Sequence, residues 1–316
     1  MYSCPPMAPP RTSASFARVA EMHGQGNRRS KDDWELYRQH RERLTRTIDG
    51  VGTAVGAGPP DGRLCLLGAG NCNDVQLDVL AQRFGTIHLV DIDGAALERA
   101  RARQAPEVRS RLVLHPGVDL TGLLGQLDAW GGEEPDLASQ QKAIDEGAAA
   151  VIQSLPAGGC DVAVSCCLMS QLGWSLEAAI EEVGKRQGRK QRAPQGSAPT
   201  VGVEIRLVML TIHLRTLGAL VRPGGAALLA SDITSSDLYP LDELGADDDL
   251  RTLADNLVRA QQVVYAGANP VLTSRVLRKD ALLKDCFGTP VTLDPWLWTG
   301  QFDRTYLVYP QQLPRK

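Results

Sequence analysis

Residues 63–103 read RLCLLGAGNCNDVQLDVLAQRFGTIHLVDIDGAALERARAR and decide the fold of this chain. The apolar run at residues 64–67 has the length of a buried parallel strand. A glycine-rich turn follows at residues 68–72, where glycine permits positive φ angles and lets a ligand approach bare backbone. Asn73 and Asp74 are typical of a helix start. The stretch therefore predicts a strand, a turn and a helix in direct succession.

A second apolar run, at residues 87–90, closes on Asp91. An acid at the tip of this second strand can accept two hydrogen bonds from a ribose diol, while the first turn presents N–H groups at a helix N-terminus. We infer an α/β domain that binds a nucleoside-type cofactor. The alternative is an α/β domain whose glycines only form a tight turn.

The spacing of the glycines distinguishes between nucleotide cofactors. A dinucleotide-binding turn requires a third glycine at the position of Asn73. The stretch instead resembles the first two motifs of class I S-adenosylmethionine (SAM)-dependent methyltransferases, although the third glycine usual in that family is replaced by Cys72. Residues 161–172 resemble the fourth motif of the family, and the Arg-Pro-Gly-Gly turn at residues 222–225 resembles the turn that precedes its fifth strand.

The resemblance implies a doubly wound, mostly parallel seven-stranded sheet with a C-terminal antiparallel hairpin. Further strands are expected at residues 111–115, 161–167 and 226–232. We expect the hairpin to pair residues 290–293 with residues 305–309, with Trp296 and Trp298 in the turn region between them.

The chain divides into three parts. Residues 1–30 are rich in Pro, Ser, Gly and Arg and are expected to form a disordered leader. Residues 31–62 are expected to form an N-terminal cap helix, over residues 33–48, and a linker. Residues 63–312 form the SAM-binding domain that the resemblance implies. The cap helix either packs on this domain or acts as a lid over the cofactor.

The resemblance places SAM across the carboxyl ends of the first, second and fourth strands. It implies that the turn faces the methionine part, Asp91 the ribose, Ile92 the adenine face and Asp119 the adenine edge. Asp119 could equally cap the helix that follows it. The implied cofactor-binding residues are Gly68, Ala69, Gly70, Asn73, Asp91, Ile92, Asp119, Leu120, Ser165 and Cys166. Residues expected on the acceptor side are Tyr37, Arg41, Ser170, Gln171 and Asp232.

The resemblance implies a SAM-dependent methyltransferase that acts on a small molecule, but no catalytic base can be assigned. The five histidines have no metal-ligand spacing, so we expect no metal site. The seven cysteines are odd in number and lack a CxxC motif, which indicates structural thiols in a cytoplasmic protein. We therefore do not expect Cys166 or Cys167 to act as a nucleophile.

Three other functions remain open: a non-catalytic SAM-binding module, an NAD-dependent oxidoreductase, and an aminopropyltransferase of the same fold. The net charge of −3 does not favour a nucleic-acid partner, and no apolar run approaches membrane-spanning length. The polar, basic segment at residues 183–200 is expected to be a flexible loop, either a surface insertion or a contact for an anionic substrate or RNA.

Overall fold

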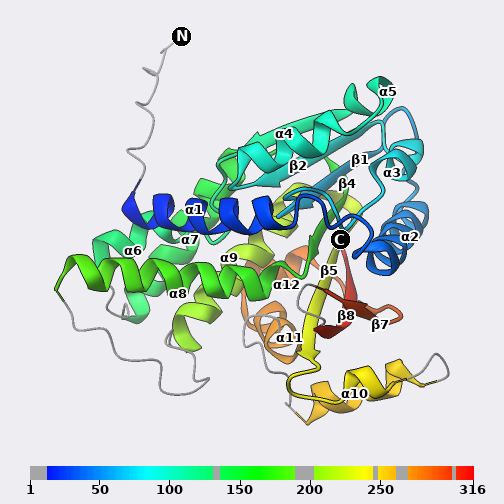
Figure 1. Cartoon of the computed structure of the whole chain (residues 1–316). Coiled ribbons are helices and arrows are strands. Elements are labelled where there is room, and N and C mark those ends of the chain that lie inside the picture. The colour runs from blue at the N-terminus through cyan, green and yellow to red at the C-terminus, as the bar shows by residue number, and fades with distance from the viewer. Residues whose placement is uncertain (1–12, 131–135, 189–202, 245–247, 261–269, 301–303) are drawn as a thin grey trace.

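The computed structural model describes residues 13–130, 136–188, 203–244, 248–260, 270–300 and 304–316. Its strands form one sheet in the order β3-β2-β1-β4-β5-β8-β6, and β7 pairs with β8 (Figure 1). The first five strands run parallel to one another, and β8 runs antiparallel to β5, β6 and β7. The strands are β1 (Arg63–Leu67), β2 (Thr86–Asp91), β3 (Leu112–Pro116), β4 (Cys160–Cys166), β5 (Val221–Ser235), β6 (Val291–Thr292), β7 (Trp296–Thr299) and β8 (Thr305–Pro314).

The predicted fold class is confirmed, with eight strands in place of seven. The difference arises in the first arm of the hairpin, which is divided into β6 and β7. Pro295 lies between these two strands and has no N–H group to donate to a ladder, so one continuous strand is disfavoured. Trp296 and Trp298 were expected in a turn, and this was wrong because both lie in β7.

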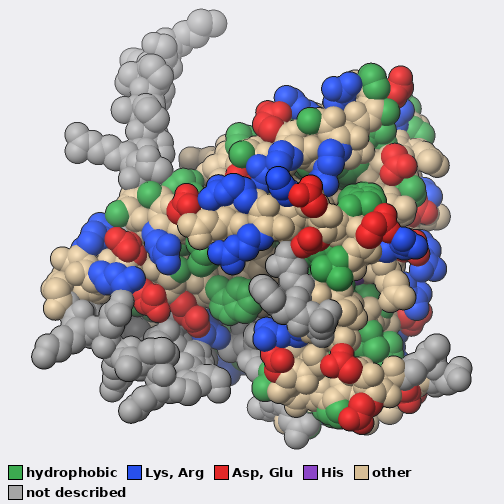
Figure 2. All heavy atoms as spheres, viewed as in Figure 1, with side chains coloured by type: hydrophobic (Ala, Val, Ile, Leu, Met, Phe, Trp, Pro, Cys, Tyr) green, Lys and Arg blue, Asp and Glu red, His purple; other side chains and the backbone are tan. Residues whose placement is uncertain are grey.

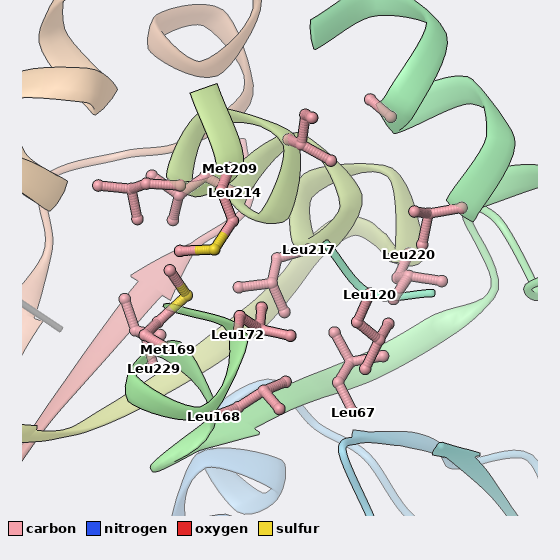
Figure 3. Packing of buried hydrophobic residues seen from close by; sticks show 14 of the residues in the cluster. Leu67, Leu120, Leu168, Met169, Leu172, Met209, Leu214, Leu217, Leu220 and Leu229 are labelled. Atoms are coloured by element: carbon pink, nitrogen blue, oxygen red, sulfur yellow. The ribbon is translucent and has the colours of Figure 1, made fainter. Parts of the chain in front are cut away.

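Helices cover both faces of the sheet. They are α1 (Ala14–Arg29), α2 (Arg38–Ala54), α3 (Leu77–Arg83), α4 (Gly94–Ala102), α5 (Pro106–Arg109), α6 (Leu124–Trp130), α7 (Leu137–Gln153), α8 (Leu168–Arg186), α9 (Val203–Leu220), α10 (Leu250–Arg259), α11 (Pro270–Lys279) and α12 (Ala281–Cys286), with a short 3₁₀ turn η1 (Leu241–Glu243). Because side chains alternate along a strand, Leu64 and Leu66 pack with α2, α3 and α4, whereas Leu67 packs with α6, α8 and α9. Figure 3 shows the core on the α8 and α9 side of the sheet, where Leu168 and Leu172 of α8 pack near Leu217 of α9.

The predicted disordered leader is wrong for residues 14–29, which form α1. Ser13 caps this helix by accepting a hydrogen bond from the Phe16 N–H, and Val19 is buried in the core. Glycines at positions 24 and 26 obscure the helical pattern in the sequence. Helix α1 lies between α4 and α8, across the carboxyl ends of the strands (Figure 1). Residues 1–12 lie outside the described residues.

The predicted cap helix exists, but it is displaced toward the C-terminus. It is α2, which starts at Arg38 after the N-cap residue Tyr37 rather than at residue 33. Its apolar side packs on α3, β4 and β7, with Leu44 and Ile48 fully buried.

Two other expected boundaries were also wrong. Helix α3 starts at residue 77 rather than at Asn73, and α8 continues through residues 183–186, where a loop was expected. The rest of the predicted basic loop is described only as far as residue 188.

Candidate functional site

A cavity of about 340 Å³ opens at the carboxyl ends of β1, β2, β4 and β5. Its volume is in the range of small-molecule sites. The sequence-predicted residues in its lining are Tyr37, Gly68, Ala69, Gly70, Asn73, Asp91, Ser170, Gln171 and Asp232. The turn after β1, the acid that ends β2, two polar residues after β4 and an acid in β5 are therefore brought together at one edge of the sheet.

The glycine-rich turn is held against the end of β2 by Asp91. One Asp91 carboxylate oxygen accepts a hydrogen bond from the Gly70 N–H at 2.8 Å, and the other accepts one from the Asp93 N–H at 2.8 Å. Each carboxylate oxygen can accept more than one hydrogen bond, so acceptor capacity remains toward the cavity. Burial raises the pKa of Asp91 to about 6.

The glycine-rich turn adopts positive φ angles, both at two of its glycines and at a residue that is not glycine. Gly68 and Gly70 have positive φ angles, and a Cβ atom at Gly68 would lie 2.6 Å from Leu168 Cδ1. Cys72 stands where the resembled family has its third glycine, and it also adopts a positive φ, of 52°. Cys72 therefore adopts a backbone conformation that favours glycine.

Beside the main cavity lies a smaller hollow lined by Ile92, Asp119 and Leu120. Gly68, Asp91 and Gln171 line both spaces, so the two are adjacent. Asp119 accepts hydrogen bonds from the Thr121 and Leu124 N–H groups, and burial raises the pKa of its carboxyl group. It thus holds the turn before α6, and it also borders the hollow.

Two sequence-predicted cofactor residues line neither the main cavity nor the hollow beside it. Ser165 is fully buried, and its hydroxyl pairs with His213 Nε2 of α9 at 2.8 Å. Cys166 faces the α2 side of the sheet, where its thiol lies 3.7 Å from His40 Nε2. The next residue, Cys167, lines the cavity instead. It has a φ of 47°, and this left-handed backbone turns the chain from β4 into α8.

Among the residues expected on the acceptor side, the Ser170 hydroxyl donates a hydrogen bond to the Asp232 carboxylate at 2.9 Å. Asp232 is 5% exposed, and burial raises its pKa to about 7. Arg41 was expected beside these residues, but its side chain is buried elsewhere. Its guanidinium donates to the Trp34 and Asn73 carbonyl oxygens and stacks on the Trp34 ring. It holds the segment before α2 against the glycine-rich turn and is absent from the described cavity lining.

Several cavity residues were not predicted from the sequence. They are Met22, His23, Gly26, Asn27, Ser30, Asn71, Asp74, Cys167, Trp174, Trp298 and Tyr306. Those of α1 were missed because no helix was predicted there. Asp74 was assigned to a helix start, and burial raises its pKa to about 6. Trp298 and Tyr306 carry no signal in the sequence for this location, because only the pairing of β7 and β8 brings them to it.

A histidine and two cysteines also meet beneath the cavity. His40 Nε2, Cys166 Sγ and Cys167 Sγ lie within 4.8 Å of one another. However, the Trp296 indole N–H donates to His40 Nδ1 at 3.0 Å, so the proton of this neutral ring is on Nε2 and faces Cys166. Burial, together with the charge of Arg41, lowers the pKa of His40 to about 3. This is a hydrogen-bonded cluster, because a ring that carries its proton on Nε2 cannot bind a metal there.

No protein-family model and no curated protein matches this chain. Solved structures with distant likeness include geranyl diphosphate C-methyltransferase from Streptomyces coelicolor, which is 9% identical, with 86% of this chain and 79% of that chain covered and a TM-score of 0.39. A candidate SAM-dependent methyltransferase from Methanococcus maripaludis is 10% identical, with 92% of both chains covered and a TM-score of 0.39. A candidate exported protein from Bordetella parapertussis is 12% identical, with 96% of this chain and 71% of that chain covered and a TM-score of 0.38.

The strand order is five parallel strands followed by an antiparallel hairpin whose last strand enters the sheet. The fold is that of the class I SAM-dependent methyltransferases. The resemblance stated from the sequence is thus confirmed at the level of the fold. In the part of the chain that the structure describes, no helix combines the length and apolar character needed to cross a membrane.

Proposed function

We propose that the chain is a SAM-dependent methyltransferase that acts on a small molecule. The observation that carries this proposal is the meeting, in one cavity, of the glycine-rich turn and Asp91 with the Ser170–Asp232 pair. Methyl transfer requires a donor site and an acceptor site side by side, because the methyl group moves directly from one molecule to the other. The proposal predicts the donor at β1 and β2 and the acceptor at β4 and β5.

Under this proposal, Asp91 accepts hydrogen bonds from the ribose, and the adenine lies in the hollow lined by Ile92, Asp119 and Leu120. The turn at residues 68–70 faces the methionine part. SAM supplies a methyl group on an already activated leaving group. The task of this chain is then to align the two molecules and to exclude water, and the position of α1 across the strand ends supports the second role.

The walls of the cavity favour a small acceptor over a macromolecule, because residues of α1, the segment before α2 and the β7–β8 hairpin all contribute to its lining. A cytoplasmic location is part of the proposal. It is supported by the free thiols of all six cysteines in the described residues.

Calorimetric titration of the purified protein with SAM, S-adenosylhomocysteine, decarboxylated SAM and NAD tests the proposal. We expect binding of the first two at micromolar or lower Kd and no measurable binding of NAD. Preferential binding of decarboxylated SAM would indicate an aminopropyltransferase, and preferential binding of NAD an oxidoreductase. A protein that binds SAM but transfers no methyl group to any member of a broad acceptor panel would be a non-catalytic binding module.

A further inference from the structure

The charged side chains in the described cavity lining are all acidic. The described lining residues include the carboxyl groups of Asp74, Asp91 and Asp232, but no lysine or arginine. Arg18, Arg28 and Arg29 of α1 are exposed, and Figure 2 shows blue side chains over α1 and α4. Arg99 of α4 is half-buried behind the lining, where it pairs with Asn71 and Asp93. His23 also lines the cavity, and burial lowers the pKa of its ring, which favours the neutral form. An anionic acceptor would therefore find no charged partner among these side chains, whereas a cation would find three.

The three carboxyl groups fall on two sides of the cavity. Asp91 ends β2 and lies on the proposed donor side, whereas Asp74 follows the glycine-rich turn of β1 and its charge acts on Tyr37 and Cys167, toward β4. Asp232 lies in β5, and the path from β2 to β5 crosses three strand spacings, through β1 and β4. At about 4.8 Å for each spacing, Asp232 lies roughly 14 Å from Asp91. Asp232 is therefore too distant to share the ribose with Asp91, and it remains for the acceptor.

Aromatic rings form a wall on the same side as Asp232. The Trp298 ring lies 5.4 Å from Tyr37 and stacks on Tyr306 at 5.2 Å, measured between ring centroids. Asp232 pairs with Val308 across the β5–β8 ladder, and Tyr306 lies two residues before Val308 on β8, so all three side chains share one face of the sheet. The β5–β8 register shifts immediately after Asp232, and such bulges often redirect a side chain next to an active site.

We infer that the methyl acceptor is an amine that binds as its ammonium ion, between the Asp232 carboxylate and the aromatic faces of Tyr37, Trp298 and Tyr306. This inference rests on the proposed function and names its substrate class. A desolvated cation gains from a carboxylate and also from the negative faces of aromatic rings. A neutral alcohol or a carboxylate of the same shape gains from neither.

Asp232 then has a second role in the reaction. The bound ammonium loses one proton to the Asp232 carboxylate, which frees the nitrogen lone pair. That pair forms the new nitrogen–carbon bond as the methyl–sulfur bond breaks, and the sulfur keeps the electron pair of the broken bond. The methylated nitrogen now carries the positive charge that the sulfonium has lost, and Asp232 releases its proton to water. A carboxyl group whose pKa burial raises to about 7 is suited to accept and release this proton near neutral pH.

The test measures binding, so it does not require that the natural acceptor be known. The protein is saturated with S-adenosylhomocysteine and screened by ligand-observed NMR and calorimetry against matched trios, in which one hydrocarbon group carries an amine, a hydroxyl or a carboxylate. A typical trio is 2-phenylethylamine, 2-phenylethanol and 3-phenylpropanoate, and the panel extends to aliphatic, polyamine and heterocyclic skeletons. We expect amines to bind at least tenfold more tightly than their matched alcohols and acids. If no amine exceeds its matched partners, the inference is overturned.

Variants identify the site of this preference. Asp232→Asn keeps the shape of the side chain but loses the charge, and it should remove the amine preference while leaving S-adenosylhomocysteine affinity within about threefold. Trp298→Leu should weaken amine binding severalfold. Asp294→Asn is the matched control, since its side chain is 86% exposed and pairs with Arg251 at the surface. An amine preference that survives in Asp232→Asn would overturn the assignment. Failure of the wild type to bind S-adenosylhomocysteine would instead refute the proposed function.

Discussion

The Trp296 indole N–H donates a hydrogen bond to His40 Nδ1 at 3.0 Å and so joins β7 to α2 across 256 residues of sequence. His40 is 1% exposed, and its ring also lies 4.5 Å from the Trp298 centroid. His40→Ala would leave a cavity and a buried indole N–H without its partner. We expect a loss of about 3 kcal/mol in the free energy of unfolding, measured by urea denaturation.

Arg43→Ala is the control for this substitution, because Arg43 lies on the same helix and is exposed. It should change the free energy of unfolding by less than about 0.5 kcal/mol. Equal effects of the two substitutions would mean that the His40–Trp296 contact does not stabilise the fold.

Asp232 should make the unliganded protein less stable as the pH rises. Its pKa is about 7 in the folded chain and near the ordinary 3.8 when unfolded, so the folded state holds the proton more tightly between these values. Stability linked to this group is therefore present at pH 4 and is lost as the pH rises toward 7, by up to about 4 kcal/mol. Asp232→Asn should remove this dependence. The measurement is the unfolding free energy of the wild type minus that of the variant, at each pH from 5 to 8. This difference should decrease as the pH rises. A constant difference would contradict the prediction.

The affinity for S-adenosylhomocysteine should fall in acid because of Asp91. Only the ionised carboxylate accepts two ribose hydrogen bonds, and its pKa in the unliganded protein is about 6. Affinity should be constant above pH 7 and should decrease below pH 6, approaching tenfold for each pH unit. Asp91→Asn should bind at least tenfold more weakly at pH 7.5 and should lose most of this dependence. An equal affinity of wild type and variant at pH 7.5 would remove Asp91 from the site.

Cys167 can be tested as a structural residue with an unusual backbone. At φ 47° a β-branched side chain is strained, so Cys167→Val should be about 1–2 kcal/mol less stable than Cys167→Gly.

The hydrogen bond with Cys166 and burial raise the pKa of the Cys167 thiol, which makes it a poor nucleophile. Cys167→Ala and Cys166→Ala should therefore keep S-adenosylhomocysteine binding and methyl transfer within about tenfold. Loss of transfer by several orders of magnitude in a folded variant would reinstate a covalent role.

Helix α1, rather than α2, should respond to the cofactor. Asn27 donates a side-chain hydrogen bond to Asp93 at 3.1 Å, and its carbonyl accepts one from Asn71 at 2.7 Å, so α1 is fastened to both motif turns. Amide hydrogen exchange over residues 14–29 should slow when S-adenosylhomocysteine binds, while that of α2 stays unchanged. Asn27→Ala should weaken binding severalfold. The control is Gln25→Ala, since Gln25 is exposed and pairs with Glu21 within the same helix. Identical exchange with and without ligand would show that α1 is a fixed wall.

The parallel part of the fold was predictable because it depends on local patterns. Apolar runs separated by a glycine turn mark β1 and β2, and the acid at the end of β2 marks the edge where the cavity lies. Asp91, Ser170 and Asp232 line one cavity at that edge for the same reason, since the ends of parallel strands meet there.

The rest of the site depends on contacts between distant segments, which no local pattern encodes. Arg41 appeared suited to a ligand, but Trp34 and the Asn73 carbonyl occupy its guanidinium. Trp298 and Tyr306 reach the cavity only because β8 enters the sheet beside β5. Helix α1 owes much of its position to tertiary packing, which overrides the weak helix propensity of its glycines.

The aromatic wall has a practical consequence for changing the protein. Tyr37, Trp298 and Tyr306 support one another, and none of them belongs to the parallel strands that carry the glycine-rich turn and Asp91. A combinatorial library confined to these three positions can enlarge, narrow or recharge one half of the cavity without altering the other half. If the proposed function holds, the two halves of the site are in this sense separable, and acceptor choice can be re-engineered while cofactor use is retained.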